Sequence, residues 1–265
     1  MATLVNRTIL IVGASSGIGA QVARDVAGHG NRLVVVARRA PELAAVAADV
    51  RAAGSACLDL VADALDPDAA AAVVARTVAE FGAVDVALLN VGQGPDMAMA
   101  EAGVGDIARM MALNYDVTVN YLVPLIAQLR RQGGGLIAQT NSLAGLLGLP
   151  RQGPYSAAKA AVRILIDAAR VELAPEGIRF TSLYPGFVAT ARVSADGLPK
   201  PFQISEKQAA RHVVRALRRE PADASFPWTT SALVRLLRAL PVPVSGPLLR
   251  KLARDRDRGG GVRPA

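Results

Sequence analysis

The sequence is poor in the residues that form disulfides and hold metal ions. Its 265 residues include one cysteine, Cys57, and two histidines, His29 and His212. A single cysteine excludes an intramolecular disulfide, and so few candidate ligands argue against a protein metal site. Cys57 is interpreted as an inert core residue.

Long hydrophobic runs are also lacking. No apolar stretch approaches the roughly 18–20 residues that a membrane-spanning helix needs. Arg7 interrupts the apolar start of the chain, which therefore lacks the pattern of a signal peptide. Hydrophobic residues nevertheless make up 52% of the chain and mean hydropathy is +0.31, which excludes a disordered or fibrous protein. We expect a globular protein of a reducing compartment, the cytoplasm.

In the last quarter of the chain, acidic residues are few relative to basic ones, whereas the two kinds are balanced in the rest. Residues 1–199 hold 16 Lys and Arg against 17 Asp and Glu, whereas residues 200–265 hold 14 against 5. The net charge of +8 therefore comes from the C-terminal part, while the body is neutral. A neutral body argues against nucleic acid as a partner.

Apolar, β-rich runs alternate with Ala-rich stretches of helical length. Most runs are continuously hydrophobic, as in parallel strands that are covered on both faces. The expected strands are 8–12, 32–37, 85–90, 136–140 and 178–184, with a weaker one at 56–60. The expected helices are 17–29, 41–53, 67–81, 105–131, 155–174 and 206–219. This alternation predicts an α/β fold with a doubly wound parallel sheet.

The length favours one domain rather than two. We expect a cofactor-binding and catalytic core over 1–195 and a substrate flap with a basic helical extension over 196–253. A disordered tail is expected over 254–265, which is rich in Arg, Asp and Gly.

A glycine-rich turn lies between the first expected strand and the first expected helix. Such a turn lets the backbone approach a pyrophosphate, and the helix N-terminus supplies free N–H groups. The segment predicts a nucleotide site; its proposed contacts are Gly13, Ser15, Ser16, Gly17, Ile18 and Gly19.

The end of the second expected strand indicates which nicotinamide dinucleotide is bound. An acidic residue there would bind a ribose 2′-OH, whereas an arginine accommodates a 2′-phosphate. This strand ends in Arg38 and Arg39 with no carboxylate, so NADP(H) is favoured over NAD(H).

Several motifs in the right order resemble the classical short-chain dehydrogenase/reductase family, a Rossmann-fold family, over residues 8–192. The glycine turn has the family's Gly-xxx-Gly-Ile-Gly form, and Tyr155 with Lys159 matches its Tyr-xxx-Lys motif. Ser142 precedes the tyrosine by the family's usual thirteen residues, and Asn114 lies in the long helix that carries its fourth catalytic residue.

The same resemblance implies further cofactor contacts. This chain has counterparts of three segments of the family. The first is an Asp-x-x-Asp segment that touches adenine, the second forms the adenine-side wall after the fourth strand, and the third is a Pro-Gly…Thr segment that holds the nicotinamide carboxamide. They are Asp63, Ala64, Asn90, Val91, Gly92, Pro185, Gly186, Val188 and Thr190. Two positions depart from the family pattern: Val91 changes the contour of the wall, and Asn141 replaces a non-catalytic serine.

The chemistry of a carbonyl reductase accounts for these residue types. Lys159 lies at i+4 from Tyr155, so its ammonium can lower the pKa of the phenol and hydrogen-bond the nicotinamide ribose. Ser142 is expected to orient the substrate oxygen, and Asn114 to hold a water that connects the lysine to solvent. Tyr155 is the expected acid–base.

The same resemblance implies that three segments border the substrate: 93–99, 143–150 and 187–204. They are mostly apolar and carry no arginine cluster. We therefore expect a small hydrophobic carbonyl compound or alcohol as substrate. The expected wall residues are Met97, Met99, Leu143, Leu146, Leu147, Phe187 and Phe202.

Two basic amphipathic stretches, 230–240 and 247–252, follow the core, with Trp228 nearby. Such stretches could lie on a membrane surface, or they could cover the substrate pocket or pack on a partner subunit. We favour covering the pocket or packing on a subunit over membrane contact. The resemblance implies a homodimer or homotetramer.

We conclude that the sequence predicts an NADPH-dependent reductase of an apolar ketone or aldehyde. Two alternatives stay open: an NAD-linked alcohol dehydrogenase that works oxidatively, and a non-catalytic NADP(H)-binding sensor or scaffold.

Overall fold

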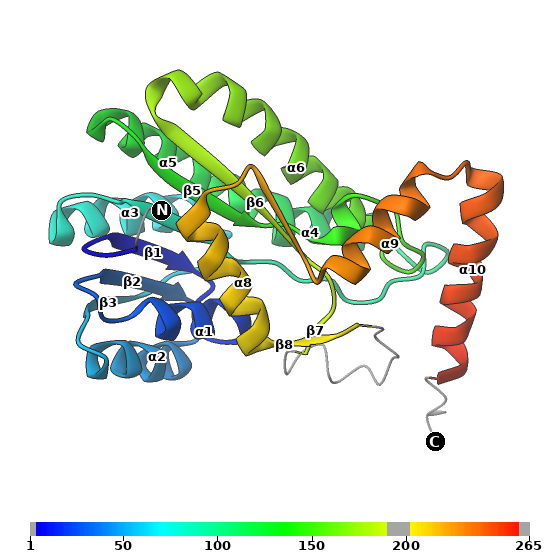
Figure 1. Ribbon diagram of the computed structural model, residues 1–265, viewed down its shortest axis with the longest axis horizontal. Helices are drawn as coiled ribbons and strands as arrows, with labels where there is room; N and C mark the ends of the chain where they lie inside the picture. The colour runs from blue at the N-terminus through cyan, green and yellow to red at the C-terminus, as the bar shows by residue number, and fades with distance from the viewer. Residues whose placement is uncertain (1–3, 190–201, 260–265) are drawn as a thin grey trace.

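A seven-stranded parallel sheet forms the centre of the protein (Figure 1). The computed structural model describes residues 4–189 and 202–259, with side chains as far as Arg250. The strand order is β3-β2-β1-β4-β5-β6-β9. The chain adds β2 and β3 on one side of β1 and the remaining strands on the other, so the order of addition switches between β1 and β4. The strands are β1 Thr8–Val12, β2 Arg32–Ala37, β3 Ala56–Val61, β4 Val86–Leu89, β5 Gly135–Thr140, β6 Ile178–Pro185 and β9 Asp223–Phe226.

Helices cover both faces of this sheet, which confirms the predicted doubly wound α/β fold. The helices are α1 Gly17–Val26, α2 Ala40–Ala52, α3 Pro67–Phe81, α4 Val104–Met111, α5 Val117–Gln132, α6 Gly153–Leu173, α8 Glu206–Arg219, α9 Trp228–Ala239 and α10 Val242–Gly259. Side chains alternate along the strands between two cores: Ile9 and Ile11 pack beneath α1, α2 and α8, whereas Leu10 and Val12 pack beneath α3, α5 and α6. Burial on both faces explains why the strands read as continuous apolar runs.

The structure differs from the expected elements in the long segment 105–131. It begins as α4, widens into a π-helical turn over Ala112–Asp116 and continues as α5. Such widened turns are frequent at functional sites, and this one carries Asn114.

A seventh strand, β9, was not expected. Its four residues, Asp223 to Phe226, lie between two prolines and include polar side chains, so the segment has no apolar run to indicate a strand. β9 pairs in parallel with β6 and becomes the outer edge of the sheet. A separate two-stranded pair joins β7, Val188–Ala189, to β8, Ile204–Ser205.

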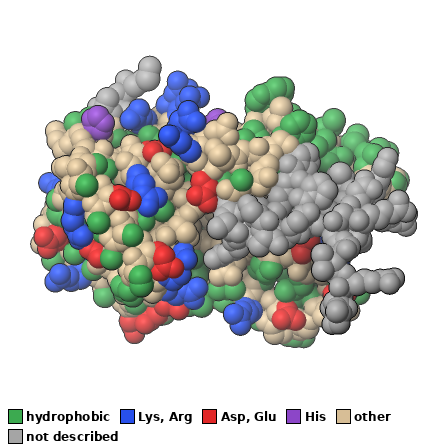
Figure 2. Space-filling model, turned by 90° about the horizontal axis from the view of Figure 1, so that it is seen from below, with side chains coloured by type: hydrophobic (Ala, Val, Ile, Leu, Met, Phe, Trp, Pro, Cys, Tyr) green, Lys and Arg blue, Asp and Glu red, His purple; other side chains and the backbone are tan. Residues whose placement is uncertain are grey.

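The two basic stretches beyond the core form α9 and α10, which lie beside the C-terminal ends of the strands (Figure 1). Helix α10 continues to Gly259 and so covers the first residues of the tail for which disorder is expected. Hydrophobic side chains gather at this end of the molecule (Figure 2). The largest exposed ones on the two helices are Trp228, Leu233, Leu236, Val242, Val244 and Leu248.

No helix in the described ranges is long and apolar enough to span a membrane. Within those ranges there is also no group of three or more His, Cys, Asp and Glu side chains that could hold a metal ion.

Candidate active site

The glycine turn between β1 and α1 is shaped by backbone contacts that no side chain would allow. Gly13 has φ +86°, and a Cβ there would lie 2.7 Å from the carbonyl oxygen of Asn90. A Cβ on Gly19 would lie 2.2 Å from the carbonyl oxygen of Gly13. These contacts bring the turn against the end of β4, where the topological switch point of the sheet lies.

The N-terminus of α1 is open toward this turn. Its N-cap, Ser16, makes no side-chain capping bond, so the first N–H groups of the helix keep their capacity for an anion. Ser16 Oγ instead accepts a hydrogen bond from Arg39 Nη2 at 2.6 Å, and Ser15 Oγ accepts from the same nitrogen at 3.0 Å. A pyrophosphate group therefore fits the residues present, and Gly17 and Ile18 begin the helix that would hold it.

The two arginines after β2 take different directions. Arg39 reaches the serines of the turn and also pairs with Glu42 at 3.0 Å. Arg38 instead pairs with Asp63 at 3.6 Å. Both side chains are about half exposed, so both can turn toward a phosphate.

The remaining expected cofactor contacts follow the ends of β3, β4 and β6. Ala64 is buried and its carbonyl accepts from Asn120, while Asn90 Oδ1 accepts from Thr140 Oγ1 at 2.9 Å. Val91 and Gly92 come two and three residues after the end of β4. Pro185 ends β6, the Gly186 N–H donates to the Phe226 carbonyl, and Val188 lies buried in β7. Thr190 lies outside the described residues.

Ser142, Tyr155 and Lys159 come together where β5 ends beside α6. Tyr155 and Lys159 project from one face of α6, with Lys159 Nζ 5.8 Å from the centroid of the Tyr155 ring. The Ser142 hydroxyl makes a hydrogen bond with the Tyr155 side chain. Lys159 Nζ donates to the carbonyl oxygen of Thr140 at 2.9 Å.

Burial dominates the electrostatics of this group. Burial raises the pKa of Tyr155 above its ordinary value, and the hydrogen bond from Ser142 lowers it in part. Burial lowers the pKa of Lys159 to about 8. The neighbour that lowers the Tyr155 pKa in this arrangement is Ser142, while the Lys159 ammonium donates to Thr140. That Lys159 lowers the pKa of the phenol stays a prediction.

Asn114 is fully buried in the π-helical turn and faces the same group. Its Nδ2 donates to the Gln93 carbonyl at 2.8 Å, and its Oδ1 accepts from the Gln93 N–H at 3.0 Å. A Cβ on Gly92 would lie 2.7 Å from Asn114 Oδ1 and 2.9 Å from Lys159 Nζ. Asn114 therefore fixes the segment after β4 beside the lysine.

One residue of this site was missed in the sequence. A Cβ on Gly94 would lie 3.0 Å from the Tyr155 ring, so the backbone of Gly94 covers the phenol directly. The sequence feature that could have indicated this contact is a glycine two residues after Gly92. Gly94 has no role in the family pattern described above.

The expected substrate wall is only partly assembled. Leu143 is buried in a small cluster with Tyr184 and Val234, and Leu146 and Leu147 pack against it. Met99 and Phe202 are more than half exposed. Most of the expected flap, 190–201, lies outside the described residues.

The other singled-out residues lie apart from this site. Cys57 is in β3, where burial raises the pKa of its thiol to about 11. The ring of His212 stacks on Phe226 with centroids 5.0 Å apart, and burial lowers its pKa.

The fold and the glycine turn define a protein of the dinucleotide-binding, Rossmann type. The chain belongs to the short-chain dehydrogenase family: the family model for short chain dehydrogenases matches residues 7–198. Members of this family use nicotinamide cofactors, and the protein is therefore an oxidoreductase.

Known proteins of several bacteria are similar to this chain. An uncharacterized oxidoreductase of Myxococcus xanthus is 30% identical over 252 residues, which cover 95% of this chain and 100% of that protein. The ketoacyl reductase HetN of Nostoc is 28% identical over 91% of this chain and 86% of its own length. A solved short-chain type dehydrogenase/reductase from Mycobacterium marinum superposes with a TM-score of 0.77 at 26% identity, over 84% of this chain and 94% of that one.

Proposed function

We propose that the protein is an NADPH-dependent reductase that converts an apolar ketone or aldehyde into an alcohol. The observation that carries the proposal is the grouping of Ser142, Tyr155 and Lys159 beside the end of β5. A bound nicotinamide would supply the hydride. The similarity to a protein named as a ketoacyl reductase supports carbonyl chemistry.

Tyr155 is the proposed proton donor to the substrate oxygen. A phenol is protonated at neutral pH, as a proton donor must be; burial raises the pKa of Tyr155 and so weakens it as an acid, and the hydrogen bond with Ser142 acts in the opposite direction. The Ser142 hydroxyl, already bonded to Tyr155, would share the substrate oxygen and stabilise the charge that develops there.

Lys159 is the proposed partner that restores the proton and holds the nicotinamide ribose. With a pKa of about 8, its amine is mostly protonated at pH 7 and can exchange protons near that pH. Asn114 would position the backbone of Gln93, to which it is hydrogen-bonded. It would also hold a water near Gly92 that connects Lys159 to solvent.

The preference for NADPH rests on the arginines after β2. The Arg39 guanidinium lies with two serine hydroxyls at the glycine turn, Arg38 follows the same strand, and no carboxylate ends β2. A ribose 2′-phosphate would find charge-assisted donors there. Arg39 is the stronger candidate because it already contacts both serines.

The remaining parts of the proposal concern substrate, assembly and location. The apolar side chains Leu143, Leu146 and Leu147 favour a hydrophobic substrate over a charged acid. A homodimer or homotetramer and a cytoplasmic location stay predictions. Contact of α9 and α10 with a membrane stays the less favoured role of the extension.

Fluorescence titration with NADPH and NADH tests the cofactor assignment, and Arg38→Ala and Arg39→Ala are compared with wild type. We expect tight NADPH binding that weakens toward the NADH level in Arg39→Ala. Equal or tighter NADH binding in the wild type would overturn the NADPH assignment and favour an oxidative alcohol dehydrogenase. Binding of neither dinucleotide would contradict the enzyme assignment.

A further inference from the structure

A recess at the outer edge of the sheet is lined by more arginines than carboxylates, so its lining carries a net positive charge. It has a volume of about 300 Å³ and lies between α6, β6, β9 and α9. Three arginines and two aspartates line it, together with the side chains of Leu146 and Tyr184. None of these residues belongs to the glycine turn or to the Ser142–Tyr155–Lys159 group.

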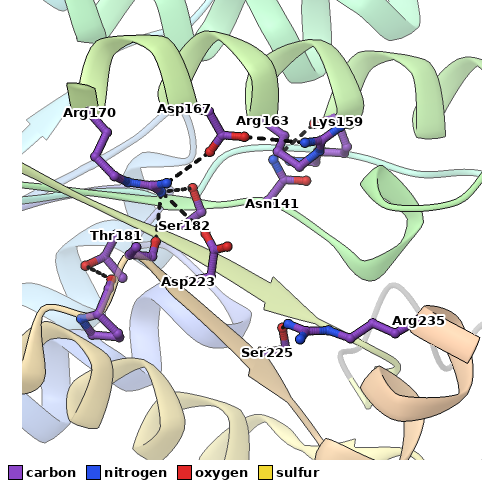
Figure 3. Close-up of polar contacts among 12 residues, drawn as sticks. Asn141, Lys159, Arg163, Asp167, Arg170, Thr181, Ser182, Asp223, Ser225 and Arg235 are labelled. Atoms are coloured by element: carbon purple, nitrogen blue, oxygen red, sulfur yellow. Dashed lines mark hydrogen bonds and ion pairs between the residues drawn. The ribbon is translucent and has the colours of Figure 1, made fainter. Parts of the chain in front are cut away.

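The two aspartates are already paired by arginines of α6 (Figure 3). Arg170 binds Asp167 at 3.0 Å and Asp223 at 3.4 Å. Arg163 binds the second oxygen of Asp167 at 3.4 Å. Both carboxylates are therefore already paired with arginines of α6.

Among the described residues, no carboxylate pairs with the arginines of α9. Arg235 donates to the Ser225 hydroxyl at 3.3 Å. In the part of the chain that the structure describes, Arg238 has neither a hydrogen-bond partner nor an ion-pair partner. The two side chains are three residues apart on α9, so they lie on one face of that helix and line the recess together.

The α6 side adds a third guanidinium group to the lining, that of Arg163, which is already paired with Asp167 at 3.4 Å. Three guanidinium groups therefore line the recess with two carboxylates, which leaves an excess of one positive charge.

We propose that this recess is a binding site for a small phosphate anion, either inorganic phosphate or a phosphate monoester. Guanidinium groups match phosphate oxygens in charge and in geometry, and the two guanidinium groups of α9, which the aspartates do not pair, would bind them. In a monoester, the organic part would lie against Leu146 and Tyr184, which supply the apolar wall.

The recess is distinct from the proposed cofactor site. The glycine turn follows β1, and β4 and β5 separate β1 from β6 in the sheet. Leu146 also belongs to the expected substrate wall, but phosphate binding by the recess does not depend on the proposed reaction.

Isothermal titration with inorganic phosphate at low ionic strength tests the site. We expect saturable binding by the wild type and at least tenfold weaker binding by Arg235→Gln/Arg238→Gln. The matched control is Arg218→Gln/Arg219→Gln, which removes two exposed arginines from the end of α8 and should bind as the wild type does. Arg39→Gln separates the recess from the glycine turn and should also bind phosphate normally.

Unchanged affinity in Arg235→Gln/Arg238→Gln, or absence of saturable binding by the wild type, would overturn the proposal. Loss of binding in Arg39→Gln alone would overturn it too, since the phosphate would then lie at the glycine turn. A second titration with glycerol 3-phosphate distinguishes the two sources. Tighter binding than that of inorganic phosphate supports a monoester ligand, and equal or weaker binding supports free phosphate.

Discussion

The side chain of Asn141 joins the end of β5 to helix α6. Its Nδ2 donates to the backbone carbonyl of Lys159 at 3.0 Å (Figure 3). Its Oδ1 accepts from the Ser142 N–H at 2.9 Å, and the residue is only 2% exposed. Asn141 thus fixes the backbone of Ser142 relative to that of Lys159. The asparagine that departs from the family pattern is therefore a proposed positioning residue.

Replacing Asn141 should loosen this link without removing a reacting group. We expect Asn141→Ala to lower kcat roughly tenfold, the effect of losing one to two buried hydrogen bonds from a positioned site. Steady-state kinetics should show a smaller change in the KM for NADPH than in kcat, because Asn141 bonds the backbone of Lys159 and not the ammonium that would hold the ribose. Asn141→Ser should recover part of the rate. A rise in the KM for NADPH with kcat intact would contradict the positioning role.

Gly94 should tolerate no side chain, because its backbone covers the Tyr155 ring. A Cβ there would lie between 3.0 and 3.1 Å from three ring carbons. We expect Gly94→Ala to displace the phenol and to lower kcat by roughly tenfold, since misplacement of a reacting group by a fraction of an ångström is costly.

The matched control for this substitution is Gly105→Ala on α4, where an added Cβ meets nothing within 4 Å. That variant should keep full activity and gain about 0.5–1 kcal/mol of stability, because alanine favours the helix. Equal activity of the two variants would show that Gly94 does not constrain Tyr155.

The lowered pKa of Lys159 predicts a pH-dependent stability. Its pKa is 10.5 in the unfolded chain and about 8 in the folded protein, a difference of about 3 kcal/mol. Below pH 8 the lysine is charged in both states and the full burial penalty applies. Between pH 8 and 10.5 only the unfolded state keeps the proton, so the free energy of unfolding should rise with pH.

Urea unfolding of the wild type and of Lys159→Met at pH 7 and pH 10 measures this effect. Methionine has similar length and does not titrate, so all other groups cancel in the comparison. The wild type should gain up to about 3 kcal/mol relative to the variant as the pH rises. Parallel changes in the two proteins would mean that the Lys159 pKa is not lowered.

Much of the fold could be predicted because local sequence patterns encode it. Continuous apolar runs identified five of the seven strands, since these are buried on both faces, and the partly exposed edge strand β3 gave a weaker signal. Strand β9 could not be predicted, because its pairing with β6 depends on tertiary contact rather than on its four residues. The π-helical turn around Asn114 likewise leaves no mark in the pattern of residues.

The candidate site could be located from the sequence, but not its detailed contacts. The i, i+4 spacing placed Tyr155 and Lys159 on one helix face, as the structure has them. The direction of each side chain could not be derived. Arg39 rather than Arg38 contacts Ser15 and Ser16, and Lys159 turns to Thr140. These choices depend on rotamers set by neighbours distant in sequence.

The most direct test of the account is NADPH oxidation measured with a panel of hydrophobic ketones and aldehydes, for the wild type and Tyr155→Phe. The account predicts turnover by the wild type with at least one apolar carbonyl compound. It predicts a loss on the order of a thousandfold in Tyr155→Phe, with NADPH binding nearly unchanged, because only the proton donor is removed. Unimpaired turnover by Tyr155→Phe would contradict the assignment of Tyr155 and with it the proposed mechanism.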